Sequence, residues 1–275
     1  MTGFDDELRP EITSPTNPRV KWLVSLRKRR TRDAERVTVL EGFDELTLAL
    51  DAGVTPRQLF WCDAFGPNPA GPSTLQRVAA LGCDVVALGA AAFDKASYRE
   101  SPDGWLAVVD NPETALDELV LGRVPLVLVC EAIEKPGNLG AMLRTAEAVG
   151  VDAVVAASHV ADWGNPNVVR ASKGTVFAVP VSSASSTEVV DWLRRRGLTI
   201  VVASPDADDL VTDVELAGPT AIVVGSEHAG VSSHLRRCAD KSAALPMVGR
   251  VNSLNVATSA AVLLYEAVRQ RGLAE

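Results

Sequence analysis

The sequence is poor in the residues that build metal sites and disulfide frameworks. It contains four cysteines, which lie far apart, and three histidines. No CxxC pair is present, so the ligand spacing of zinc sites is missing and we expect no metal. Cysteines scattered in this way are typical of reduced thiols, which predicts a cytoplasmic protein.

Long apolar runs are also missing. No stretch approaches the roughly 18 apolar residues of a membrane-spanning helix, so no membrane partner is expected. The first residues, MTGFDDELRPE, are acidic and have no apolar core, so we expect a disordered tail at 1–11 rather than a signal peptide. The chain of 275 residues is 47% apolar, which is enough for one large or two ordinary domains.

The formal net charge of −8 hides a basic run near the N-terminus. From Arg19 to Arg36 the net charge is +6. Such a run can be a solvated helix face or a surface that binds phosphates. Its basic residues are Arg19, Lys21, Arg27, Lys28, Arg29, Arg30, Arg32 and Arg36.

The pattern of the chain changes near 118–123. Before that point, helical patterns such as NPRVKWLVSLRKRR are mixed with short strand-like runs such as RQLFWC and DVVALG. From Val124 on, strands and helices alternate, beginning with the buried strand pattern VPLVLVCEA and a helix at 139–149 with Asn138 as its N-cap. This pattern predicts an α/β domain at 123–275 with a parallel sheet covered on both faces, after a small α/β domain at 12–118.

Glycine and polar residues follow three of the predicted strands, in KPGNLGAMLR, VVGSEHAGVS and LPMVGRVNSLN. The first turn has neither the GxGxxG spacing of dinucleotide sites nor the lysine of a phosphate-binding GxxxxGKS/T loop, so a dehydrogenase is disfavoured. Taken alone, this turn also fits a purely structural role. Ligands of open α/β sheets bind at the carboxyl ends of the strands. The three turns together therefore predict one crevice that collects their polar side chains.

The same segments carry a resemblance to a known family. KPGNLGAMLRTAEAVG, IVVGSEHAG and LPMVGRVNSLNVATSAAVLLYE resemble the three ordered motifs of the SpoU–TrmH RNA ribose 2′-O-methyltransferases, and NPNVVRASKGTVFAVPV resembles the stretch between the first two. ITSPTNPRVKWLVSLRKRR is similar to the start of the small substrate-binding domain that many members carry. The arrangement is similar to that of actinomycete antibiotic-resistance methyltransferases that modify 23S rRNA.

The resemblance implies a catalytic domain with a deep trefoil knot, a homodimer with the active site at the subunit interface, and S-adenosyl-L-methionine as the methyl donor. No metal is needed, because the sulfonium of this cofactor is already an activated donor. The matching catalytic positions are Asn138, Arg144, Glu227, Ser253 and Asn255. The matching cofactor positions are Gly225, Leu245, Met247 and Leu254, and Ala203 is added because it ends a neighbouring strand. RNA, with rRNA preferred to tRNA, is expected to contact Arg19, Lys21, Arg27, Lys28, Arg29 and Arg30.

The chemistry expected of Arg144 is electrostatic. A guanidinium stays protonated at neutral pH, so it grips a phosphate and stabilises an alkoxide more readily than it removes a proton. Gly225 is expected to let the backbone approach the cofactor closely. Several alternatives stay open: Glu227 as a carboxylate at a helix N-terminus, Arg144 as a surface residue, the same reaction on tRNA, and an RNA-binding relative without catalysis.

Overall fold

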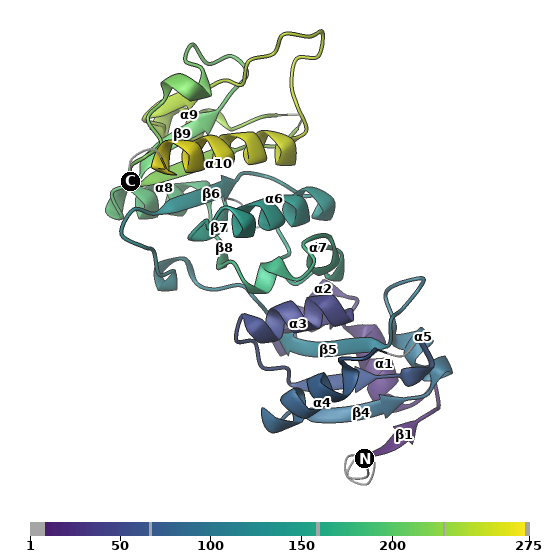
Figure 1. The fold of residues 1–275 in the computed structure, drawn as a ribbon. Helices are drawn as coiled ribbons and strands as arrows, with labels where there is room; N and C mark the ends of the chain where they lie inside the picture. Colours follow the sequence, from purple (N-terminus) through teal and green to yellow (C-terminus); the bar gives the residue numbers. More distant parts are fainter. Residues whose placement is uncertain (1–8, 66–67, 158–159, 228, 273–275) are drawn as a thin grey trace. The chain divides into compact units, whose positions relative to one another are not determined.

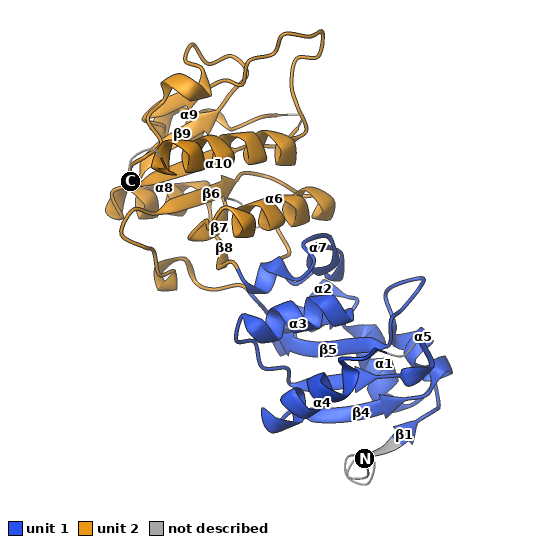
Figure 2. Cartoon of the chain, viewed as in Figure 1, with its two compact units in different colours: residues 1–112, 164–178 blue, residues 113–163, 179–275 orange. Residues whose placement is uncertain are grey.

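The computed structural model describes residues 9–65, 68–157, 160–227 and 229–272 (Figure 1). The chain divides into two compact units (Figure 2). Unit 1 runs to Pro112 and also contains Gly164–Ala178, and unit 2 contains Glu113–Trp163 and the chain from Val179 onward. The division therefore lies before the predicted boundary at 118–123. The reason is that Thr114 already bonds to Val181 of unit 2, by a 2.8 Å hydrogen bond from its backbone N–H to the Val181 carbonyl oxygen.

Unit 1 is built on a mixed five-stranded sheet in the order β1-β4-β3-β5-β2. The strands are β1 (Arg9–Ile12), β2 (Val37–Glu41), β3 (Gln58–Trp61), β4 (Asp84–Leu88) and β5 (Trp105–Asp110). The helices are α1 (Pro18–Ser25), α2 (Arg29–Glu35), α3 (Phe43–Asp51), α4 (Gly71–Ala80), α5 (Ala90–Ala96) and α7 (Pro166–Ala171). β3 runs parallel to β4 and antiparallel to β5. Leu23, Phe60, Phe93 and Leu106 lie in its buried core.

Two features of unit 1 differ from the prediction. Residues 1–8 of the predicted tail lie outside the described residues, but Arg9–Ile12 form strand β1, which pairs in parallel with β4. The disordered tail is therefore wrong for 9–11, because pairing with β4 orders a segment that has no periodicity of its own. The segment Gly164–Ala178 joins unit 1 because α7 packs against β2, and the Thr38 hydroxyl donates a hydrogen bond to the Gly164 carbonyl.

Unit 2 contains a six-stranded sheet in the order β11-β9-β10-β6-β7-β8, in which every pairing is parallel. The strands are β6 (Leu126–Cys130), β7 (Ala153–Ala156), β8 (Val181–Ser183), β9 (Thr199–Ala203), β10 (Thr220–Val224) and β11 (Lys241–Ala243). The helices are α6 (Pro136–Ala148), α8 (Ser186–Arg195), α9 (Ser233–Cys238) and α10 (Val256–Gly272). The predicted parallel sheet is thus confirmed.

Helices cover both faces of this sheet. α6 and α10 pack together on one face, and α8 and α9 cover the other (Figure 1). Side chains of β6 and β10 that alternate along the strands, such as Val127, Val129 and Val223, pack against Val189 and Leu235 of α8 and α9. None of the helices in the described part of the chain is long and apolar enough to span a membrane.

The order of the strands locates a ligand site. From β6 the chain continues to β7 on one side, whereas β10 lies on the other side of β6. Ligands of open α/β sheets bind outside the carboxyl ends of the strands at such a point. Two of the predicted motif turns follow these two strands, one after Cys130 and the other after Val224.

Candidate active site

The loop after β6 launches α6 toward the site. Ala132 has a φ of 53°, a left-handed conformation that is costly for a residue with a Cβ and often occurs at functional sites. Helix α6 begins at Pro136, where the fixed φ of proline suits the first helical position, and Lys135 is its N-cap residue. The predicted N-cap role of Asn138 is therefore wrong, since Asn138 lies inside the first turn. Its amide is free to face the neighbouring loops.

Side chains from all three motif turns meet in one polar cluster, consisting of Lys135, Asn138, Glu227 and Asn255. Glu227 Oε1 accepts hydrogen bonds from the side-chain amides of Asn138 at 3.2 Å and Asn255 at 2.8 Å. The Asn255 amide also donates to Asn138 Oδ1 at 3.2 Å, and Lys135 Nζ forms an ion pair with Glu227 Oε2. Asn255 is held in turn by α10, because its Oδ1 accepts from the Ala257 N–H at 3.0 Å.

Three of the predicted catalytic residues, Asn138, Glu227 and Asn255, are thus brought together. Lys135 was missed. Its place in the turn between the predicted strand and Pro136 was an available signal. Nothing in the sequence indicates that its ammonium group reaches Glu227.

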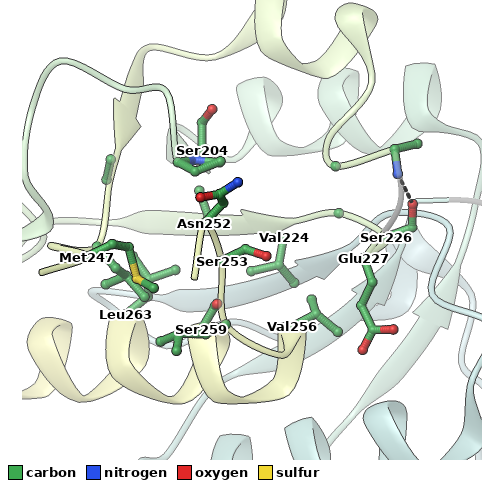
Figure 3. Close-up of a pocket in the computed structure, with 18 of the residues that line it drawn as sticks. Ser204, Val224, Ser226, Glu227, Met247, Asn252, Ser253, Val256, Ser259 and Leu263 are labelled. Carbon is green, nitrogen blue, oxygen red and sulfur yellow. Dashed lines mark hydrogen bonds between the residues drawn. The ribbon is translucent and has the colours of Figure 1, made fainter. Parts of the chain in front are cut away.

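A cavity of about 330 Å³ lies beside Glu227 of the polar cluster (Figure 3). All the predicted cofactor positions line it: Ala203, Gly225, Leu245, Met247 and Leu254. Ser253 lines the same cavity rather than joining the polar cluster, and Val224, Val256 and Leu263 add apolar wall. Asn252 and Arg236 also line it and were not predicted.

A second hollow, of about 340 Å³, is lined by the loop after β6 and by the start of α6. Its lining residues are Ala132, Ile133, Glu134, Lys135, Asn138, Ser226 and Glu227. Ser226 and Glu227 line both hollows, so these two residues lie between the two hollows.

Glu131 supports the loop that carries Glu227. This carboxylate is buried, and it accepts hydrogen bonds from the Ser232 backbone N–H at 2.6 Å and from the Ser186 hydroxyl at 3.0 Å. The end of β6 is thereby tied both to the start of α8 and to the loop 225–232. The sequence signal that could have identified it is a single carboxylate within the apolar run VPLVLVCEA.

Gly225, which lines the cavity, is also held in a close approach within the protein itself. A Cβ at this position would lie 2.2 Å from the carbonyl carbon and oxygen of Gly230 and 2.3 Å from the backbone nitrogen of Val231. A close backbone approach within the protein therefore already requires glycine here, between Gly225 and Gly230–Val231. The same turn has a 2.8 Å hydrogen bond from the Gly230 N–H to the Ser226 carbonyl.

Arg144 does not join the polar cluster. It lies on the exposed face of α6, and none of the hydrogen bonds or ion pairs among the described residues involves its side chain. Since the sheet-facing side of α6 is filled by Leu139, Met142 and Leu143, Arg144 points away from the core.

Sequence comparisons match both parts of the chain. Residues 125–265 match the SpoU rRNA Methylase family, and residues 17–107 match the MRM3-like substrate binding domain. The chain belongs to the SpoU rRNA methylase family. The resemblance found in the motif turns is thereby confirmed, and so is a substrate-binding domain before the catalytic one.

Proteins and solved structures similar to this SpoU methylase are named as RNA methyltransferases. The 23S rRNA (uridine(2479)-2'-O)-methyltransferase of Streptomyces viridochromogenes is 32% identical over 269 residues, which cover 94% of this chain and 92% of that one. An AdoMet-bound rRNA methyltransferase from Sinorhizobium meliloti has a TM-score of 0.86 at 27% identity, covering 94% and 97% of the two chains. An RNA 2'-O ribose methyltransferase structure has a TM-score of 0.81 at 40% identity, covering 95% and 99%.

The basic run of this SpoU methylase contains cations that have partners within the protein and cations that have none among the described residues. Arg32 is buried, and its guanidinium donates to the Leu26 and Arg27 carbonyls near the end of α1. Arg27 donates to the Lys95 and Ser97 carbonyls and lies 5.5 Å from the centre of the Tyr98 ring.

Two further arginines of the run have carboxylate partners. Arg19 pairs with Asp84 at 3.1 Å and Arg29 with Asp33 at 3.5 Å. Lys21, Lys28 and Arg30 are exposed and have no such partner among the described residues, so they are the members of the run most available to phosphates.

Proposed function

We propose that this protein transfers a methyl group from S-adenosyl-L-methionine to a ribose 2′-hydroxyl of 23S rRNA. The observation that carries the proposal is the pair of hollows with Ser226 and Glu227 between them. A methyl transfer needs a site for the donor and a site for the acceptor that open onto one another. The name of the Streptomyces relative supports 23S rRNA as the methyl acceptor. The AdoMet-bound structure from Sinorhizobium supports S-adenosyl-L-methionine as the methyl donor.

The cavity suits the proposed cofactor. Its volume of about 330 Å³ is within the range of small-molecule pockets. Leu245, Met247 and Leu254 supply an apolar surface of the kind that binds adenine, and Gly225 and Gly230 expose backbone groups beside it. When bound, S-adenosyl-L-methionine would supply an activated methyl group on a sulfonium.

The polar cluster gives the second hollow its chemistry. The carboxylate of Glu227 is held by two amides and an ammonium group, so its orientation is fixed before RNA arrives. Lys135 presents a cation to this hollow, where it suits a phosphate. We propose that Arg144 binds the phosphate next to the target ribose and stabilises charge on the 2′-oxygen, a task suited to its planar, permanently charged group.

The active form is proposed to be a cytoplasmic homodimer with the site completed at the subunit interface. One face of α10 supports this, because Val262, Tyr265 and Val268 are exposed there at helical spacing. A second subunit that covers this face would lie next to α6, which packs against α10 and carries Arg144.

A trefoil knot is also proposed. Its support is the segment after β11, which is hydrogen-bonded into the long β9–β10 connection: the Val211 N–H donates to the Ala244 carbonyl, and the Ala244 N–H donates to the Asp209 carbonyl, both at 2.9 Å. From this segment the chain continues to Asn255 and α10. In a trefoil knot, this last part of the chain would pass through the β9–β10 connection.

Incubation with labelled S-adenosyl-L-methionine and undermethylated RNA tests the function. We expect label in 23S rRNA as a 2′-O-methyl group at one nucleotide, found by mapping alkali-resistant linkages. Label in tRNA alone would establish the alternative substrate. RNA binding with no label in either RNA, despite measurable cofactor binding, would contradict catalysis and favour a relative that only binds RNA.

The exposed members of the basic run should contribute to RNA affinity. Replacing Lys28 and Arg30 with alanine is expected to weaken RNA binding and to lower the slope of log K against log salt by up to about two, since each lost phosphate contact changes it by roughly 0.7–0.9. Cofactor affinity should not change. Arg77→Ala is the control, because Arg77 is an exposed arginine of unit 1 outside the run, where it pairs with Asp51. Equal salt slopes for all three proteins would show that the run is a solvated face.

A further inference from the structure

Among the residues that the structure describes, two charged side chains line the cofactor cavity, Glu227 and Arg236. Glu227 already accepts hydrogen bonds from the polar cluster, and its negative charge would repel another carboxylate. Arg236 is therefore the cation available to an anionic group bound in this cavity. It belongs to α9, which follows the loop 225–232.

The guanidinium of Arg236 is oriented by that loop. Its Nε donates to the Val231 carbonyl oxygen at 2.9 Å. Its Nη2 lies over Gly230, only 3.2 Å from where a Cβ would be, and Gly230 has a φ of +64°. The terminal amino groups make no hydrogen bond to any residue that the structure describes. One edge of the planar group is thus fixed to the protein, and the other remains able to form a paired contact.

We propose that Arg236 binds the carboxylate in the methionine part of S-adenosyl-L-methionine. This inference rests on the proposed function, since it concerns the cofactor of that reaction. The carboxylate is the anionic group of a ligand that is otherwise cationic at its sulfonium and ammonium groups. A guanidinium fixed at one edge loses little conformational freedom when it binds a carboxylate through the other. Arg236 is then a residue that fixes the position of the methionine chain, and through it the direction of the sulfonium.

Calorimetry with four ligands tests the proposal. S-Adenosylmethionine and S-adenosylhomocysteine both carry the carboxylate, whereas decarboxylated S-adenosylmethionine and 5′-methylthioadenosine lack it. Arg236→Met keeps an apolar stem but removes the guanidinium. We expect this variant to bind the first two ligands about ten- to a hundredfold more weakly, as for a lost charge-assisted hydrogen bond, and to bind the other two like the unchanged protein. Arg236→Lys should recover only part of the loss.

Arg237→Met is the matched control, since Arg237 is the exposed neighbour on α9 and does not line the cavity. A similar loss for all four ligands would assign Arg236 a structural role in the loop 225–231 and overturn the proposal. Unchanged binding of all four would also overturn it. If the unchanged protein bound none of the four ligands, the proposed function itself would fail, which is a distinct result.

Discussion

Replacing Arg144 with alanine is expected to lower methyl transfer by about 100- to 1000-fold, the order found when one electrostatic contact to the transition state is removed. Affinity for S-adenosyl-L-methionine and thermal stability should stay close to those of the unchanged protein. The exposed position of Arg144 on α6, outside the described hydrogen bonds, explains why folding should not depend on it. Arg144→Lys should recover little activity, because a point charge lacks the planar pair of donors.

Single-turnover kinetics with saturating cofactor is the suitable measurement, since it separates the chemical step from product release. Arg123→Ala is the control, because Arg123 is also an exposed arginine of unit 2 but lies before β6. Near-native single-turnover rates in Arg144→Ala would show that Arg144 is a surface residue. The polar cluster around Glu227 would then have to account for the catalysis.

The convergence of the motif turns was predictable because of a simple property of parallel sheets. Strands that run in one direction end at the same edge, so polar residues after different strands meet there. Asn138, Glu227 and Asn255 were placed together on this argument. Lys135 and Arg236 could not be, since their contacts depend on loop conformations such as the left-handed Ala132 and the positive φ of Gly230.

The fold was predictable to a different extent in the two units. In unit 2, long apolar runs alternate with amphipathic helices, and this local pattern is sufficient for a parallel sheet. In unit 1, strand β1 has four residues at the edge of the sheet and is stabilised by pairing with β4, which no local pattern reveals. The membership of Gly164–Ala178 in unit 1 is likewise a matter of distant contacts, such as Thr38 with Gly164 and Glu45 with Gly174.

Gly225→Ala is expected to have the second large effect, a loss of cofactor binding that accompanies local unfolding of the site. The added methyl group would lie 2.2–2.3 Å from backbone atoms of Gly230 and Val231, which cannot rotate away as a side chain could. The loop 225–231 must then move. With it would move Ser226 and Glu227, which separate the two hollows, and the carbonyl that orients Arg236.

The expected cost is about 1–3 kcal/mol in the free energy of unfolding, typical of overpacking against a fixed neighbour. Thermal denaturation and calorimetry with S-adenosyl-L-methionine measure the two effects. Gly137→Ala is the matched control: a Cβ at Gly137 meets no atom within 4 Å, and the residue lies within α6. This control should keep cofactor affinity and lose no stability, because alanine favours a helix over glycine. Normal stability and normal cofactor affinity in Gly225→Ala would contradict this prediction. They would mean that the backbone of Gly230 and Val231 can move away from residue 225 without changing the cavity.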